Sequence, residues 1–186
     1  DAFYVAFRIP NFLRRIFGEG ALSQAFVPVF AEYRARGDTA ETKAFVDHMT
    51  GFLAVALFVV TAIGTLAAPL LIAVLAPGFL GDPAKYDLTV VMLRIMFPYL
   101  AFISLVALAA GVLNTYGRFG APAFTPVLLN LSLIGAAVWL APRMEEPVLG
   151  LAWGVFIAGL VQLLFQLPFL QRIGMLPRPR LGRVHE

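Results

Sequence analysis

The sequence predicts an all-α polytopic transmembrane bundle of about five spanning helices. Hydrophobic residues make up 60% of the 186 residues and charged residues only 13%, whereas soluble globular domains contain about 25% charged residues. The hydrophobic residues gather in five long segments, and a spanning helix needs roughly 20 of them. None of the segments alternates strictly between apolar and polar residues, so each is expected to be a helix and not a strand.

The five segments differ in how cleanly apolar they are. The first contains several charges, and the other four are nearly free of them. Short polar or Pro- and Gly-rich stretches separate them, and the tail from Gln171 onward is expected either to be solvated or to lead into further sequence. We predict a membrane domain over 1–176, a partial lobe, and a cytoplasmic tail or the start of a linker over 177–186. The apolar segments run over 2–31, 45–75, 88–113, 122–141 and 148–170.

The basic residues predict how the bundle is oriented, because loops rich in Lys and Arg stay on the cytoplasmic side of a membrane. One set of loops holds only Lys85 and Arg143. The other set is therefore expected to face the cytoplasm, with Asp1 near the outer face. The net charge of +3 is distributed as membrane topology requires, so nucleic acid is not expected as a partner. The second set consists of Arg34, Arg36, Lys43, Arg118, Arg172, Arg178, Arg180 and Arg183.

Several residues inside the apolar segments have structural explanations. Amide side chains are expected to hydrogen-bond between helices, and glycines to permit close helix packing. The prolines either curve the helices or break them around a central cavity, as in transporters, and the sequence does not decide between the two. The amides are Asn130, Gln162 and Gln166, the glycines are Gly111, Gly135, Gly154 and Gly159, and the prolines are Pro10, Pro28, Pro69, Pro98 and Pro168.

The first segment carries charges that are costly inside a membrane. Each ionisable group costs about 2.5–3.5 kcal/mol at the centre of a span. On an ideal helix Asp1, Arg8, Arg15 and Glu19 fall on one stripe, and Arg15 and Glu19 are spaced to pair. Asn11 and Arg14 form a neighbouring i, i+3 pair that points away from the stripe. Such a helix is expected to line a hydrated cavity.

Arginine in a cavity favours one class of ligand. Its planar guanidinium binds phosphate through two parallel hydrogen bonds and stays charged at any relevant pH. The alternative is that Arg14 and Arg15 extend to the interface or pair with Glu19 and Asp1. The chain has no cysteine and only His48 and His185 as imidazoles, so we expect neither a metal nor a cofactor.

The same segment reads DAFYVAFRIPNFLRRIFGEGALSQAFVPVFAEY over 1–33, and it closely resembles the second transmembrane helix of the MurJ (MviN) family. These are the bacterial lipid II flippases of the MATE-like exporter superfamily. Agreement continues along the chain in FPY (97–99), LN (113–114), PAFTP (122–126), QLP (166–168) and IGML (173–176). The resemblance implies helices two to six of an N-lobe. The first helix and the C-lobe of a full-length chain would then be missing.

The resemblance also implies roles for residues of the first segment. Arg14 matches a cavity arginine that engages the diphosphate of lipid II, and Asp1 and Asn11 match positions important for function. Arg15, Glu19 and Ser23 also match the motif, and Arg8 is a further candidate for substrate binding because it lies on the helical stripe. The helical stripe places Arg8 and Arg15 in the cavity, whereas the resemblance places Arg14 there. A break in the helix at Pro10 is expected to reconcile these two assignments.

The implied function is transport and not catalysis. Lipid II, the undecaprenyl-diphosphate-linked peptidoglycan precursor, would cross the bacterial inner membrane by alternating access, for cell wall biogenesis and cell shape. One alternative is a related O-antigen flippase or a multidrug exporter. Another is a membrane enzyme acting on polyprenyl diphosphates, although Asp38, Glu41, Asp47 and His48 form no recognisable catalytic set. A structural membrane protein is a further alternative.

Overall fold

The computed structural model describes residues 1–179, except that only the backbone is described at positions 18, 19, 21 and 23. In this part of the chain every regular element is helical, which confirms the predicted all-α bundle. The elements, in chain order, are α1 (Ala2–Arg14), η1 (Arg15–Phe26), α2 (Val27–Ala35), α3 (Thr39–Leu66), α4 (Ala68–Leu75), η2 (Pro77–Gly81), α5 (Pro83–Met96), α6 (Pro98–Thr115), α7 (Gly120–Gly135), η3 (Ala136–Leu140), η4 (Ala141–Arg143) and α8 (Pro147–Arg172).

Four helical stretches are long and apolar enough to cross a membrane. They cover Thr39–Leu66, Pro83–Thr115, Gly120–Arg143 and Pro147–Arg172, and they correspond to the last four predicted segments. The first segment is helical throughout, as α1, η1 and α2 follow one another directly. The first segment carries several charged residues and is not among the four stretches that are long and apolar enough to cross a membrane.

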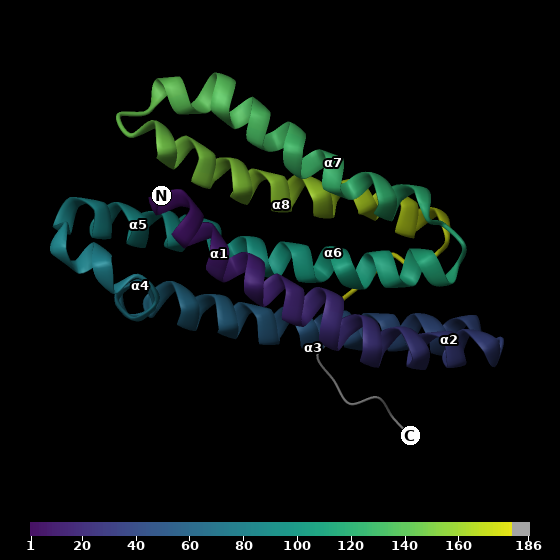
Figure 1. Ribbon diagram of the computed structural model, residues 1–186. Coiled ribbons are helices and arrows are strands. Elements are labelled where there is room, and N and C mark those ends of the chain that lie inside the picture. Colours follow the sequence, from purple (N-terminus) through teal and green to yellow (C-terminus); the bar gives the residue numbers. More distant parts are fainter. Residues whose placement is uncertain (180–186) are drawn as a thin grey trace.

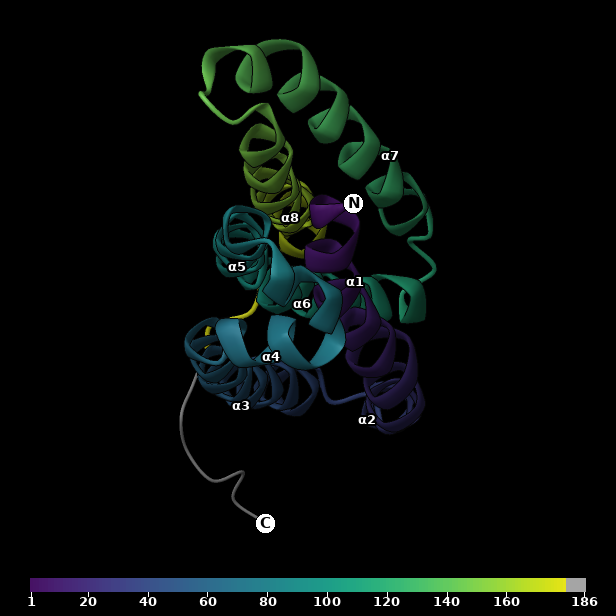
Figure 2. The ribbon, with the colours of Figure 1, turned by 60° about the vertical axis from the view of Figure 1, so that its left-hand side comes forward.

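The helices form three layers that run side by side (Figures 1 and 2). The α7–α8 pair lies on one side, α3 and α4 lie on the other, and α1, α5 and α6 lie between them. In this arrangement α6 packs against α8, and α1 packs against α5. The two predicted sets of loops lie at opposite ends of the bundle: the α2–α3 turn and the α6–α7 turn at one end, the α4–α5 and α7–α8 turns at the other.

Three of the five prolines noted above lie in the first turn of a helix, where a predicted segment divides: Pro28 at the start of α2, Pro69 in α4 and Pro98 in α6. The α3 helix ends at Leu66 and α4 begins with Pro69 in its first turn, while α5 ends at Met96 and α6 begins at Pro98. Proline lacks the amide hydrogen that would continue a helix, but it fits the first helical turn. Pro10 and Pro168 instead lie inside α-helices that continue through them.

The expected break at Pro10 is therefore wrong. The α1 helix continues to Arg14, and the irregularity comes afterwards, where Arg15–Phe26 adopts π-helical hydrogen bonding. Pro10 removes the amide hydrogen that would bond to the carbonyl of Ala6, and membrane bundles tolerate such a proline where neighbouring helices or water satisfy the carbonyl.

Glycines allow the layers to approach closely. A Cβ atom on Gly64 of α3 would lie 2.0 Å from the ring of Phe97, and one on Gly159 of α8 would lie 2.8 Å from the ring of Tyr99. Gly111 and Gly154 also face close neighbours, as predicted, whereas no atom lies within 4 Å of a Cβ at Gly135. Phe97 and Tyr99 are both buried in the main hydrophobic core.

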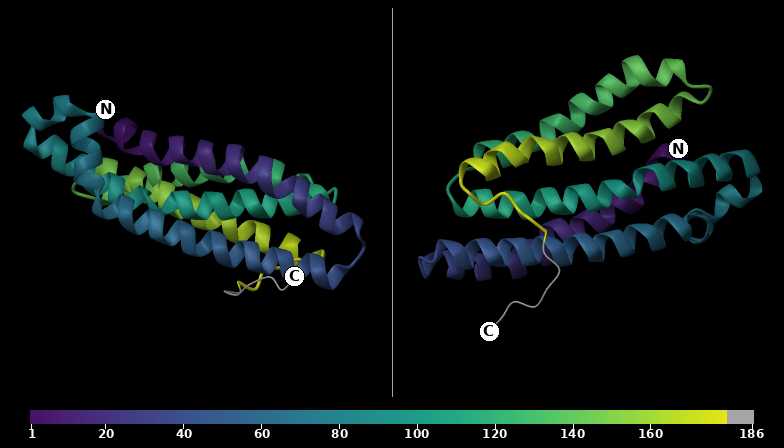
Figure 3. Two further views of the ribbon diagram at one scale, coloured as in Figure 1. Left: turned by 90° about the horizontal axis from the view of Figure 1, so that it is seen from below. Right: turned by 180° about the vertical axis from the view of Figure 1, so that it is seen from behind.

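The segment that begins at Gln171 is only partly solvated, because Arg172 and Arg178 are exposed while Met175 is buried. Gly174 adopts a positive φ of 73°, and the amide of Met175 donates to the carbonyl of Leu170, so the chain turns back over the bundle (Figure 3, right). Met175 is only 1% exposed. The amide of Arg178 donates a 2.8 Å hydrogen bond to the buried carboxylate of Asp47 on α3. Residues 180–186 lie outside the described part of the chain.

Candidate functional site

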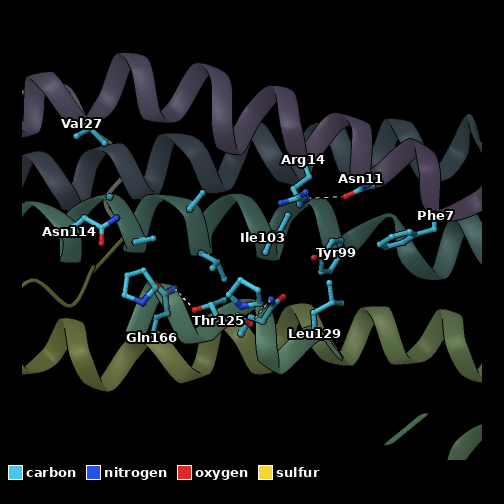
Figure 4. Close-up of a pocket in the computed structure, with 17 residues that line it drawn as sticks. Phe7, Asn11, Arg14, Val27, Tyr99, Ile103, Asn114, Thr125, Leu129 and Gln166 are labelled. Atoms are coloured by element: carbon cyan, nitrogen blue, oxygen red, sulfur yellow. Dashed lines mark hydrogen bonds between the residues drawn. The ribbon is translucent and has the colours of Figure 1, made fainter. Parts of the chain in front are cut away.

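A cavity of about 600 Å³ lies between α1 on one side and α6, α7 and α8 on the other (Figure 4). Most of its wall is apolar, with residues such as Phe7, Ile103 and Leu129. Among the side chains that the structure describes, the polar ones lining the cavity include no carboxylate. They are Asn11, Arg14, Asn114, Thr125, Gln162 and Gln166, with the buried Tyr99 beside them.

The cationic wall of this cavity is provided by α1. Arg14 is half-buried, and its Nε–H donates a 3.1 Å hydrogen bond to Oδ1 of Asn11. The two residues are three apart in a regular α-helix, so their side chains lie on the same face. Asn11 therefore orients the guanidinium of Arg14, and both side chains line the cavity.

The opposite wall is formed by α7 and α8. Nε2 of Gln162 donates to the carbonyl oxygen of Thr125 at 3.0 Å, and Nε2 of Gln166 donates to the Thr125 hydroxyl oxygen at 2.9 Å. These bonds confirm the prediction that the two glutamines connect helices. Asn130 differs, since it is exposed on α7.

A second cavity, of about 660 Å³, lies on another face of α1. Arg8 and Arg15 line it together, with Leu71 and Leu75 of α4 opposite them. Asn11 is the residue of the predicted site that borders both cavities. The helical stripe predicted for Arg8 and Arg15 therefore faces the second cavity, and Arg14, which points away from the stripe, faces the first. An unbroken helix explains both positions, so no break at Pro10 is needed.

The remaining predicted site residues lie elsewhere. Asp1 is at the start of α1, where its carboxylate is 3.7 Å from Nζ of Lys85 in an exposed ion pair, and it lines neither cavity. The side chains of Glu19 and Ser23 lie outside the described residues, as does the predicted Arg15–Glu19 pair.

Sequence reasoning missed Thr125, Asn114 and Tyr99 as cavity residues. A signal for Thr125 was present, because Gln162 and Gln166 lie one turn apart on α8 and need polar partners on a facing helix. The cavity that results offers a guanidinium on one wall and amides on the other. A guanidinium and amides are groups that can bind an anion and hydrogen-bonding partners without covalent chemistry.

Comparisons with known proteins agree on one family. A family model described as lipid II flippase MurJ matches residues 1–186. The chain is 52% identical over 177 residues to a protein named lipid II flippase MurJ from Burkholderia cenocepacia, with 95% of this chain and 34% of that protein covered. It is 49% identical over 189 residues to a probable lipid II flippase MurJ from Vibrio cholerae, with coverages of 98% and 36%.

A solved structure is also similar. It is a lipid II flippase MurJ in an inward closed conformation, with a TM-score of 0.68 and 27% identity, and the match covers 89% of this chain and 35% of that one. The chain thus spans about a third of the length of the relatives that it matches.

Proposed function

Because the chain belongs to the lipid II flippase MurJ family, as the match over residues 1–186 shows, we propose that it forms part of a flippase for a polyprenyl-diphosphate lipid. The cargo is lipid II, which moves from the cytoplasmic to the outer leaflet. Since the chain spans about a third of its relatives, we assign it part of the N-lobe. A preceding helix and a C-lobe of a longer chain complete the transporter.

The observation that carries this proposal is the Arg14 guanidinium in a cavity whose other polar lining side chains, among the described residues, are uncharged amides and hydroxyls. A guanidinium is always charged, and its fork geometry matches phosphate oxygens. Asn11 orients it through a hydrogen bond, which lowers the entropy cost of forming a two-point contact with a diphosphate. Asp1, Arg8, Arg15, Glu19 and Ser23 stay predicted contributors, and Arg8 and Arg15 act from the second cavity.

The mechanism needs only capture and release. The diphosphate docks at Arg14 while the cavity faces the cytoplasm, and the polyprenyl chain stays in lipid. Rocking of the two lobes then exposes the head group to the outer side. The membrane potential contributes, because moving one charge across it is worth about 2.3 kcal/mol per 100 mV.

Orientation follows from the basic loops. We place the end of the bundle that carries Arg34, Arg36, Arg118 and Arg172 in the cytoplasm, because loops rich in Lys and Arg are retained there. The opposite end, with Lys85 and Arg143, then faces outward across the bacterial inner membrane. The tail after α8 lies on the cytoplasmic side.

The rival functions fit the cavity less well. A multidrug exporter for cations is expected to place carboxylates in its cavity, whereas the charged side chain described in the wall of this one is the cation Arg14. An O-antigen flippase would also use a cationic cavity, but the relatives described above carry the lipid II name. The family is one of transporters, and the described lining residues of the cavity include no pair of acid and base groups for a polyprenyl-diphosphate enzyme.

The test is lipid II flipping by the full-length protein in proteoliposomes. Wild type is compared with Arg14→Gln and with a matched control, Arg143→Gln, which removes a guanidinium from the exposed α7–α8 turn. We expect Arg14→Gln to reduce flipping about 10-fold or more and Arg143→Gln to leave it near wild type. Equal rates for all three proteins would contradict the proposal, and chemical conversion of lipid II would favour the enzyme.

A further inference from the structure

The wall of the cavity that faces Arg14 contains two amides in unusually well-defined orientations. Gln162 is 2% exposed and Gln166 is 0% exposed, and they lie one turn apart on α8. Figure 4 shows Gln166 and Thr125 on one side of the cavity and Arg14 with Asn11 on the other. All five residues line the same cavity.

Hydrogen bonding fixes which end of each amide is which. The Thr125 hydroxyl donates its single hydrogen to the carbonyl of Ala121 at 2.9 Å, so towards Gln166 it acts only as an acceptor. The carbonyl of Thr125 is an acceptor by nature, and Gln162 points at it. Both glutamines must therefore direct their NH₂ groups to Thr125, and both Oε1 atoms point elsewhere.

Those two oxygens carry the inference. Within the described part of the chain, Oε1 of Gln162 and Oε1 of Gln166 are both buried and have no hydrogen-bond partner. A buried acceptor without a donor is unfavourable, and native proteins rarely leave one unsatisfied. Two of them on one turn of the cavity wall indicate a ligand that brings donors of its own.

The chemistry of the two walls defines such a ligand. Arg14 favours an anionic group, and the glutamine oxygens favour hydroxyl or amide N–H donors. The cavity volume of about 600 Å³ lies within the range of small-ligand sites, roughly 300–1,000 Å³. A diphosphate followed directly by a sugar presents both kinds of group in that order.

We propose that Gln162 and Gln166 are specificity-determining residues, which accept hydrogen bonds from the sugar attached to the diphosphate. This inference rests on the proposed function and deepens it. The glutamines allow the protein to distinguish a sugar-bearing carrier from the bare polyprenyl diphosphate, which has the same anionic group. Thr125 is a positioning residue, because it holds both amides in the accepting orientation.

The experiment compares two lipids in equilibrium binding to the full-length protein in detergent: lipid II and undecaprenyl diphosphate without a sugar. We expect wild type to prefer lipid II by about 10-fold, as two neutral hydrogen bonds predict. The variant Gln162→Met/Gln166→Met, which nearly conserves volume, is expected to lose this preference. Its affinity for undecaprenyl diphosphate should stay at the wild-type value, which also shows that the cavity is intact.

Further variants separate the possible explanations. Thr125→Val should reduce the preference by about threefold, and Thr125→Ser, which keeps the hydroxyl, should restore it. Asn130→Leu removes an exposed amide from α7 and should change neither affinity. Arg14→Gln should weaken both lipids by the same factor and leave the preference intact.

The results that would overturn the inference are distinct from those that would overturn the proposed function. If the double glutamine variant keeps the preference for lipid II, or weakens both lipids equally, the glutamines do not read the sugar. If Arg14→Gln leaves both affinities unchanged while the glutamine variant loses the preference, the diphosphate assignment fails and the sugar assignment stands.

Discussion

Arg14 donates a hydrogen bond of 3.1 Å from its Nε–H to Oδ1 of Asn11, one turn earlier on α1. The bond links a charged group to a neutral acceptor, so it orients the guanidinium without neutralising it. A carboxylate at position 11 would instead compete with an anionic ligand for the same charge. The pair therefore has the chemistry of an anion site that is orientated in advance.

Removing the acceptor should weaken the site without abolishing it. We expect Asn11→Leu to lower the affinity for undecaprenyl diphosphate about three- to tenfold, because the guanidinium loses its orienting bond. In a double-mutant cycle with Arg14→Gln the two effects should not add, since both act through one group. Additive losses of affinity would show that Asn11 acts separately from Arg14.

The two cavities on α1 predict different sensitivities. Arg14 lines the cavity shared with α6, α7 and α8, whereas Arg8 and Arg15 line the cavity shared with α4. We expect Arg8→Gln to change the affinity for undecaprenyl diphosphate by about twofold or less, because interactions with a more distant charge are screened. Calorimetric titration of undecaprenyl diphosphate into the Arg8→Gln and Arg14→Gln variants measures both affinities. A larger loss of affinity for Arg8→Gln than for Arg14→Gln would place the diphosphate in the second cavity.

The contact between Gly64 and Phe97 predicts a stability effect. A Cβ at position 64 would lie 2.0 Å from the Phe97 ring, so Gly64→Ala should destabilise the bundle by about 1–3 kcal/mol, as overpacking does. Thermal unfolding in detergent measures the change. Gly135→Ala is the matched control, because its Cβ would meet no atom within 4 Å, and a higher propensity for helix should make it neutral or stabilising.

A compensating substitution tests the same contact. Phe97→Leu removes part of the ring that Gly64 accommodates, so Gly64→Ala should cost less in a Phe97→Leu background than in wild type. The same cost in both backgrounds would mean that the destabilisation arises from another neighbour of Gly64.

The Asp47 carboxylate should hold the segment after α8 in place. It is buried, it pairs with Lys43, and it accepts the hydrogen bond from the amide of Arg178. We expect Asp47→Asn to raise hydrogen exchange at the Arg178 amide by about 10-fold, because hydrogen bonds to charged acceptors are stronger. Asp38→Asn, at the exposed start of α3, should leave that exchange rate unchanged. An unchanged rate in Asp47→Asn would show that the segment is held by apolar contacts alone.

Much of the architecture follows from local pattern. Long apolar segments specify spanning helices because the backbone must satisfy its own hydrogen bonds in lipid. The Asn11–Arg14 pair also follows from spacing, since residues three apart share a helix face. All four prolines were possible helix breaks on sequence grounds. The sequence alone did not show that helices end before Pro69 and Pro98 but continue through Pro10 and Pro168.

The rest depends on tertiary packing. Which face of α1 meets which helix decides that Arg14 and Arg8 enter different cavities, and no spacing rule contains that information. The π-helical stretch from Arg15 to Phe26 was likewise not predicted from the sequence. Thr125 is a polar residue in an apolar segment, and it became part of the site only because α7 places it opposite Gln162 and Gln166.

The central claim, that lipid II docks its diphosphate in the cavity beside Arg14, is tested most directly by photocrosslinking. A photoreactive phenylalanine analogue replaces Ile103 in the cavity wall or, as the control, Phe58, which is 73% exposed on α3. We predict that lipid II crosslinks at position 103, that excess undecaprenyl diphosphate prevents it, and that Arg14→Gln reduces it about 10-fold or more. Crosslinking at position 103 that is no stronger than at position 58, or that is unaffected by Arg14→Gln, would contradict the account.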